Sequence, residues 1–410
     1  MEAALATGGW GRNLSALRHD RYRSLWIASL VSNLGGQTQA VAAAWLMASI
    51  TSSSTPVALV QSATTGPLLV LSLFAGAIAD IYDRRLVMLA AQTAMLIVAL
   101  GLSVMTWLHW TTPALLLVCT ALMGAGSAVN APAWQASVRD HVPFHELGQA
   151  AALNSLQVNV ARSAGPALGG VIVALAGSAP VFLFNGLSYI GLITVLFSWS
   201  PDKPKRPRRK PSLVATIIAG LRYVMRSADL RAVVLRGAAI GTAGSGVWAL
   251  MPLLARDGLS EGPSTYGLLM AAFGCGAVAG AFFTTPARAS LGDEWTFRSG
   301  TLALGASVIL AGLAINLPLT AVALFVSGFC WLITVGTLGI RAQLSASSEF
   351  AGRALSIFQM ATFGGVAIGS GLVGLLAEHT SLTTAFTASG LAVLATLALC
   401  RRYRFVGSGL

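Results

Sequence analysis

A cation and a helix breaker stand together in a run of small residues, Arg162-Ser163-Ala164-Gly165-Pro166-Ala167-Leu168-Gly169-Gly170. The run lies midway along an apolar segment long enough to cross a bilayer. A charge or a proline at that depth is tolerated only where protein or water surrounds it. Glycine permits close helix contact, and proline frees a carbonyl and bends the helix. The run therefore predicts a mobile, cavity-lining helix, with ordinary small-residue packing as the alternative.

Other polar side chains inside apolar segments point to the wall of the same cavity. The predicted set is Asn33, Gln37, Asn130, Gln135, Asn154, Asn159, Arg162 and Gln359. Each amide could instead hydrogen-bond two helices together. Arg162 costs about 2.5–3.5 kcal/mol at mid-membrane, and no Asp or Glu lies at the centre of a segment to offset that cost. We expect it to favour neutral or anionic ligands over cations, with snorkelling or packing as the alternative.

The sequence lacks the residues that ATP binding, metal binding and catalysis would require. No Gly-x-x-x-x-Gly-Lys-Ser/Thr motif occurs, so ATP is not expected as the energy source. The four cysteines lie in apolar segments without metal-ligand spacing, and His141 and His145 fall in a predicted loop. No convergent catalytic constellation is found. We therefore expect no enzyme activity, metal or cofactor, and a lipid-modifying membrane enzyme remains only a remote alternative.

The composition predicts an all-α polytopic membrane protein. The 410 residues are 55% hydrophobic and only 10% charged, whereas soluble domains average about 25% charged residues. An apolar helix of about 20 residues spans the hydrocarbon core. The predicted spans are 24–48, 56–79, 86–107, 112–138, 149–176, 179–200, 232–255, 264–287, 298–316, 318–341, 353–377 and 382–400.

The net charge of +12 is an orientation signal. If the N-terminus is cytoplasmic, then of the 26 Lys and Arg residues only Arg162, Arg236 and Arg256 fall outside the cytoplasmic segments. This asymmetry follows the positive-inside rule and predicts two cytoplasmic termini. We expect a membrane-lipid environment and no nucleic-acid partner.

The chain divides into two similar parts. A basic, proline-rich stretch begins at Pro201, and the predicted division is 1–200, a cytoplasmic linker 201–231, and 232–410. Shifting the sequence by 202 residues aligns Arg139 with Arg341 and Gln157 with Gln359. Parallel six-helix repeats of this kind place a substrate site near the midplane between the two parts.

The loop after the second predicted span carries Gly76-Ala77-Ile78-Ala79-Asp80-Ile81-Tyr82-Asp83-Arg84-Arg85. It resembles the loop motif of the major facilitator superfamily, although Ile81 stands where that family usually has a base. The resemblance implies twelve transmembrane helices in two pseudo-symmetric six-helix bundles. It also implies a conformational gate at Gly76, Asp80, Asp83, Arg84 and Arg85, in which Asp80 faces the N-terminus of a helix that starts near Arg353. Simple helix capping by these residues is the alternative.

The run at Gly165, Pro166, Gly169 and Gly170 resembles the antiporter motif of the same superfamily, and residues 120–175 resemble the branch of siderophore exporters and macrolide efflux pumps. The resemblance implies a monomeric, proton-coupled exporter in the bacterial inner membrane. Its substrates would be amphipathic neutral or anionic small molecules, siderophore- or drug-like, moved by alternating access. Import of a small organic solute on the same fold is the alternative.

Overall fold

Helices account for nearly all of the chain, and no strand occurs in the part that the structure describes. The structure is a computed structural model that describes residues 15–138, 141–199, 213–347, 350–402 and 405. Within these helices, the side chains of 72–73, 75–81, 144, 213–218, 351 and 401–402 are not described. The predicted all-helical class is confirmed.

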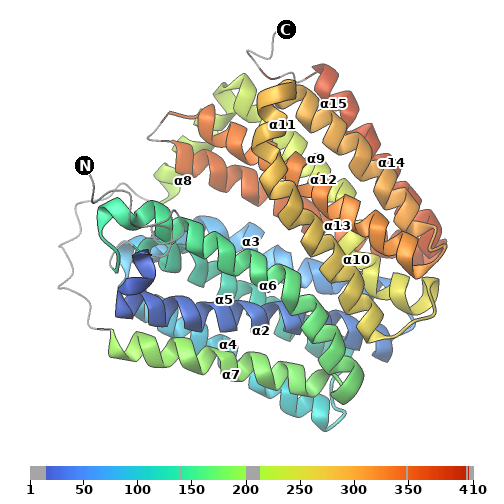
Figure 1. The fold of residues 1–410 in the computed structure, drawn as a ribbon, viewed down its shortest axis with the longest axis horizontal. Coiled ribbons are helices and arrows are strands. Elements are labelled where there is room, and N and C mark those ends of the chain that lie inside the picture. Colours follow the sequence, from blue (N-terminus) through green and yellow to red (C-terminus); the bar gives the residue numbers. More distant parts are fainter. Residues whose placement is uncertain (1–14, 139–140, 200–212, 348–349, 403–404, 406–410) are drawn as a thin grey trace, which may run out of the picture.

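The first group of helices packs mainly on itself (Figure 1). Its members are η1 (Ser15–Arg18), α2 (Asp20–Ile50), α3 (Ser54–Ile81), α4 (Arg84–Trp107), α5 (Pro113–Ser137), η3 (Phe144–Glu146), α6 (Leu147–Ala176) and α7 (Ser178–Ser198). We call it the N-terminal group.

The second group, which we call the C-terminal group, follows a short helix, α8 (Leu213–Arg226), that falls inside the predicted linker. Its members are α9 (Ala228–Gly244), α10 (Gly246–Leu253), the π-helical turn η4 (Leu254–Gly258), α11 (Pro263–Gly312), α12 (Leu317–Leu344), α13 (Ala351–His379), α14 (Leu382–Ala395) and α15 (Leu397–Arg402). In α8, the Tyr223 ring stacks on the ring of Phe350. The Tyr223 hydroxyl accepts a hydrogen bond from the Ser347 amide, and this bond lowers the pKa of Tyr223.

Side-chain caps and glycines set the helix ends. Thr112 accepts a hydrogen bond from the Leu115 amide, and Asn316 accepts one from the Leu319 amide, at the starts of α5 and α12. Gly177, with φ +80°, separates α6 from α7. Gly292, with φ +74°, kinks α11, whose helical residues run through the interval predicted as a loop between 264–287 and 298–316. The kink falls inside that interval, where the positive φ of a single glycine takes the place of the longer loop that the sequence predicts.

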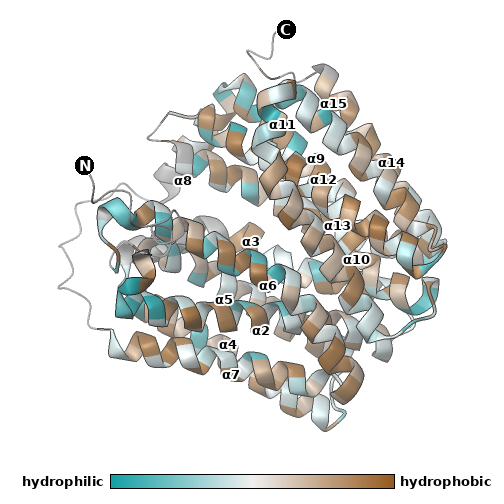
Figure 2. Cartoon of the chain, viewed as in Figure 1, coloured by the Kyte–Doolittle hydropathy of each residue, from teal (hydrophilic) through white to brown (hydrophobic). Residues whose placement is uncertain are grey.

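Nine of the helical segments in the described part are long and apolar enough to cross a membrane. Figure 2 shows hydrophobic residues along most of the long helices and hydrophilic residues gathered toward helix ends. Large apolar side chains face outward, among them Leu175 at 83% exposure and Phe282 at 76%. Such an exterior is stable in lipid rather than in water.

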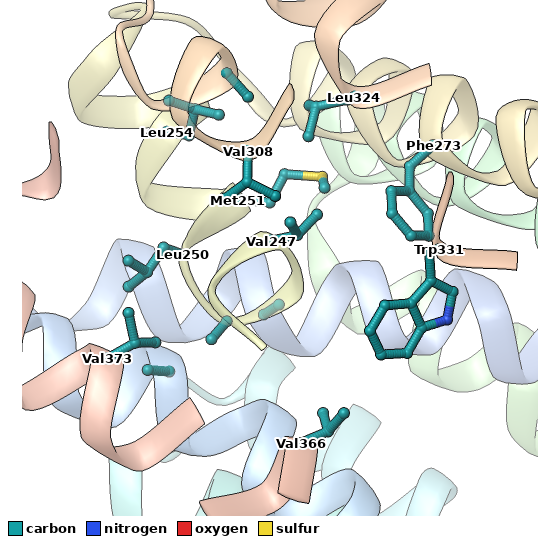
Figure 3. Close-up of a cluster of buried hydrophobic side chains, with 14 of the residues drawn as sticks. Val247, Leu250, Met251, Leu254, Phe273, Val308, Leu324, Trp331, Val366 and Val373 are labelled. Atoms are coloured by element: carbon teal, nitrogen blue, oxygen red, sulfur yellow. The ribbon is translucent and has the colours of Figure 1, made fainter. Parts of the chain in front are cut away.

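Aromatic residues fill the centre of the C-terminal group. Trp248 of α10 meets Trp331 edge-on at 4.5 Å between ring centroids and Phe273 at 5.0 Å, and Figure 3 shows Phe273 and Trp331 among the surrounding aliphatic side chains. Edge-on geometry is the favoured arrangement of aromatic pairs. Trp331 belongs to the core of the C-terminal group, and Trp248 packs against that core.

The two groups meet along two seams. One joins α3 to α13, where the Ser62 hydroxyl donates to the Ala367 carbonyl at 2.6 Å, and the other joins α6 to α11. In Figure 1 the groups approach each other where α6 meets α11 and diverge toward α8. The predicted cavity-lining helix, α6, therefore lies on a boundary between the groups.

Candidate functional site

The glycines of α6 bring two neighbouring helices into close contact. A methyl group at Gly165 would lie 2.5 Å from Gln37 Cβ, and one at Gly169 would lie 2.9 Å from Thr38 Cα, both on α2. Real Cβ atoms essentially never approach other atoms so closely. Helix α2 can therefore pack against α6 here only because Gly165 and Gly169 have no side chain.

The same stretch of α6 faces α11 with its other side. A methyl group at Gly170 would lie 2.8 Å from Gly267 Cα, and one at Gly267 would lie 2.7 Å from the Pro166 carbonyl oxygen. Further along, a methyl group at Gly274 would lie 2.6 Å from the Arg162 carbonyl oxygen. The four motif residues thus hold α6 between α2 of its own group and α11 of the other group.

The register between α2 and α6 places Asn33 level with Arg162. The Tyr22 hydroxyl donates to the Ala150 carbonyl at 3.0 Å, and Gln37 packs on Gly165. The two helices therefore run parallel with matched spacing. Asn33 precedes Gln37 by four residues and Arg162 precedes Gly165 by three, so each lies one turn before that contact.

The exposed surface of α6 has two opposite faces. Leu156, Val160, Leu168, Val171 and Leu175 form an exposed apolar stripe. At 3.6 residues per turn, Arg162 lies on the opposite side of the helix, near Ser155 and Asn159. Its side chain is exposed, with no hydrogen bond or ion pair to any described residue. This polar face therefore points away from the exposed apolar stripe of the same helix.

The remaining predicted cavity residues are more dispersed. Asn154 accepts a hydrogen bond from the Tyr22 hydroxyl at 3.2 Å and so joins α6 to α2. Gln135 and Gln359 are exposed on α5 and α13, and the buried amide oxygen of Asn130 lacks a described partner. No described hydrogen bond links Asn130, Gln135 or Gln359 to Arg162. The structure brings together only the α2 and α6 members of the set.

The loop motif is described only in its second part. The surroundings of Gly76 and the side chain of Asp80 lie outside the described part of the structure. Asp83 caps α4 by accepting a bond from the Arg85 amide at 2.9 Å. Arg84 donates to the Ala136 carbonyl at 3.1 Å, and Arg85 donates to the Leu196 carbonyl at 2.7 Å. The two arginines thus tie α4 to the ends of α5 and α7 within the N-terminal group.

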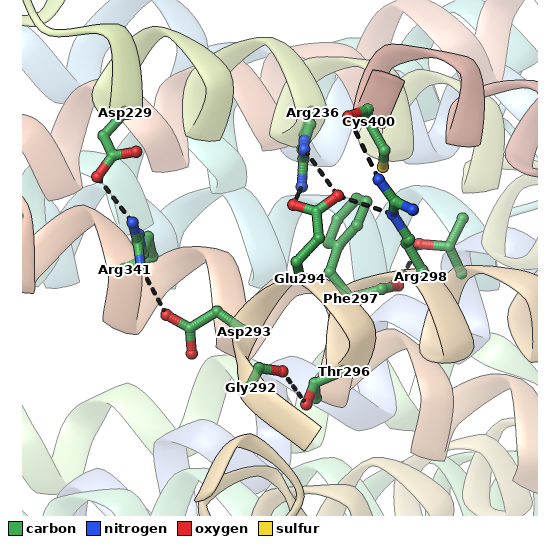
Figure 4. Close-up of polar contacts among 11 residues, drawn as sticks. Asp229, Arg236, Gly292, Asp293, Glu294, Thr296, Phe297, Arg298, Arg341 and Cys400 are labelled. Atoms are coloured by element: carbon green, nitrogen blue, oxygen red, sulfur yellow. Dashed lines mark hydrogen bonds and ion pairs between the residues drawn. The ribbon is translucent and has the colours of Figure 1, made fainter. Parts of the chain in front are cut away.

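Sequence reasoning missed a buried ion cluster in the C-terminal group. Arg236 of α9 is 0% exposed and donates to both carboxylate oxygens of Glu294, at 2.9 and 3.2 Å (Figure 4). Glu294 also pairs with Arg298 at 2.8 Å. The rings of Phe297 and Phe405 lie 5.0 and 4.1 Å from the Arg236 guanidinium carbon. A carboxylate and two aromatic faces compensate for burial of this cation.

A second arginine extends the cluster toward the kink of α11. Arg341 of α12 donates to Asp229 of α9 at 2.8 Å and to Asp293 at 3.0 Å, and Arg288 pairs with Asp293 at 2.7 Å. Figure 4 shows Asp229, Arg341 and Asp293 in a chain beside Gly292. The signal in the sequence is the adjacent pair Asp293-Glu294, which falls between the predicted spans 264–287 and 298–316.

A family model described as "Transmembrane secretion effector", of the major facilitator superfamily, matches residues 12–407. The enterobactin exporter EntS of Escherichia coli O1:K1 is 28% identical over 391 residues, which cover 94% of this chain and 92% of the relative. The enterobactin exporter of Shigella boydii serotype 18 shows the same identity and coverage.

Solved structures of transporters share the fold. The nucleoside transporter NupG superposes with a TM-score of 0.75 at 11% identity, covering 92% of this chain and 99% of that one. An inward-facing bacterial homologue of the iron transporter ferroportin gives a TM-score of 0.73 at 14% identity, covering 94% and 98%.

Proposed function

Because the chain belongs to the transmembrane secretion effector family of the major facilitator superfamily, we propose that it exports amphipathic neutral or anionic small molecules. Members of this family are multi-pass membrane transporters, and the chain is a transporter rather than an enzyme. The polar face of α6 carries the proposal. It places an exposed arginine at mid-helix, away from the lipid stripe, on the helix that joins the two groups. Export rather than import is supported by the relatives named as exporters.

We further propose that the chain crosses the bacterial inner membrane twelve times. Helices α2 and α3 would add two spans to the nine apolar segments, and α11 would count as two spans that meet at Gly292. The proposed units are 1–200 and 232–410, with 201–231 as a cytoplasmic linker and both termini in the cytoplasm. In this topology, the divergent ends of the two groups face the cytoplasm.

Alternating access is proposed to move substrate between the two groups, with the proton gradient as the energy source. Asp80 at the cytoplasmic end of α3 would bias this cycle by contact with the N-terminus of α13. Such a contact is worth about 0.3–1 kcal/mol when exposed. This energy shifts the equilibrium between the two conformations of the cycle but leaves both of them populated. The proposed transporter acts as a monomer.

The experiment that tests the function is a thermal-shift screen of purified protein over siderophores, macrolides and lipids, followed by flux in vesicles with an imposed pH gradient. Export predicts that a stabilising compound moves against its gradient only when protons move in the opposite direction. In cells, deletion of the gene should cause internal accumulation of that compound. Loss of uptake in the deletion strain would reverse the direction.

Arg162→Ala is expected to weaken binding of an anionic compound from that screen by about tenfold or more, because a hydrogen bond to a charged group contributes roughly 1.5–3 kcal/mol. Calorimetric titration measures the change. Arg162→Lys keeps the positive charge and should retain most of the affinity. Arg23→Ala, on the exposed first turn of α2, is the matched control and should bind as the parent protein does. Unchanged affinity in Arg162→Ala would remove this residue from the substrate site.

A further inference from the structure

The turn between α2 and α3 is short and is held at both ends by the other group. Helix α2 ends at Ile50 and α3 begins at Ser54. Two charged residues of the C-terminal group, Arg256 and Glu378, reach this turn. It lies at the end of the molecule where Gly170 contacts Gly267, which is the end opposite the divergence near α8 (Figure 1).

Arg256 binds the C-terminal end of α2. One terminal nitrogen of its guanidinium donates to the Ala48 carbonyl and, at 3.2 Å, to the Thr51 carbonyl. Asp257 holds the rest of the guanidinium through bonds of 2.6 and 2.8 Å. The last carbonyls of a helix have no intrahelical partner and carry the negative end of the helix dipole, so a cation is favoured there.

Arg256 itself lies in the π-helical turn η4. The Leu259 amide bonds the Leu254 carbonyl at 2.9 Å across five residues, and the Glu261 amide bonds the Ala255 carbonyl at 2.8 Å. Such turns are rare, and they occur frequently at functional sites. Here the turn places a charged side chain against the opposite group.

Glu378 binds the N-terminal end of α3. It lies in the last turn of α13, and one carboxylate oxygen accepts hydrogen bonds from the Thr55 amide at 3.2 Å and from the Thr55 hydroxyl. The first amides of a helix lack intrahelical acceptors, and the positive end of the dipole favours an anion. The two contacts are therefore opposite in charge and complementary to the two helix ends.

We propose that Arg256 and Glu378 form an outer latch that closes the transporter at the end opposite its cytoplasmic loops. The bonds from Arg256 to α2 and to Thr51, and from Thr55 to Glu378, all join one group to the other, so they must break when the groups separate at this end. The latch thus stabilises the state seen here and opposes the next step of the cycle. The inference rests on the proposed alternating access.

The test measures the separation of the two groups in purified, substrate-free protein. Spin labels replace Trp110, in the turn between α4 and α5, and Ile315, in the turn between α11 and α12, which are 64% and 60% exposed. The four native cysteines are first replaced. Double electron–electron resonance in nanodiscs then gives the ratio of long to short distances. Arg256→Ala and Glu378→Gln should each raise that ratio by about two- to fivefold, and the double variant should raise it further.

Two variants serve as matched controls. Glu261→Gln neutralises an acid at the same end whose described bond, to Thr265, stays within its own group, and it should leave the ratio unchanged. Arg256→Lys keeps the charge and should have a smaller effect than Arg256→Ala. Unchanged distances in both Arg256→Ala and Glu378→Gln would overturn the latch even if transport is normal. A raised ratio without any transport would overturn the proposed function and leave the latch standing.

Discussion

Replacing Glu294 with alanine is expected to lower the free energy of unfolding by about 3–5 kcal/mol, because the buried Arg236 loses its carboxylate partner. Arg236 is 0% exposed and directs two nitrogens at Glu294. Arg298 loses the same partner. The change should appear as a marked fall in the unfolding temperature of detergent-purified protein, followed by tryptophan fluorescence.

The matched control removes an acid from an exposed ion pair. Asp20 pairs with Arg23 at 2.8 Å, and their side chains are 83% and 52% exposed. Asp20→Ala should change stability by no more than about 1 kcal/mol. If Glu294→Ala and Asp20→Ala unfold at the same temperature, the buried cluster does not stabilise the C-terminal group.

Gly170→Val is expected to force α6 away from α11 and to destabilise the closed state by about 1–3 kcal/mol, the usual cost of overpacking. Even a single methyl group at Gly170 would lie 2.7 Å from the Pro263 carbonyl oxygen and 2.8 Å from Gly267 Cα. Because both neighbours are backbone atoms, no side-chain rotation relieves the clash. The distances between labels at positions 110 and 315 should lengthen.

Gly101→Val provides the comparison for this substitution. Gly101 lies in the C-terminal half of α4, and no atom outside the surrounding backbone of its own helix lies within 4 Å of the position that its Cβ would occupy. The same change of glycine to valine should therefore leave the label distances as they are in the parent protein. Equal distances in the Gly170→Val and Gly101→Val proteins would show that the close contact of α6 with α11 at Gly170 does not hold the two groups together.

Hydrophobic runs and glycine spacing predicted much of this molecule. The span predicted at 149–176 matches α6, which runs from Leu147 to Ala176, because twenty or more apolar residues in lipid have few alternatives to a helix. The small residues around Pro166 predicted close helix contact, and the structure shows it on both sides of α6. Both inferences depend on local sequence alone.

Contacts between distant residues were not predictable in the same way. Arg236 and Glu294 are separated by 58 positions, and their pairing depends on how α9 and α11 pack. The contact of Glu378 with Thr55 spans 323 positions. A single sequence shows where charges and helix ends lie along the chain, but it does not show which of them meet in space. The sequence also does not show that Gly292 adopts a φ of +74°, which many glycines do not, and α11 is helical on both sides of this residue.

The ring of Phe405 covers the guanidinium of Arg236 at 4.1 Å, although it follows that residue by 169 positions, 405 minus 236. At a synthesis rate of about 5–20 residues per second, Arg236 is added to the chain roughly 10–30 s before Phe405. Glu294 arrives after roughly a third of that interval. During biogenesis Glu294 and Phe297 are therefore made well before Phe405, and the insertion machinery must accommodate an incompletely shielded charge until this last ring is made.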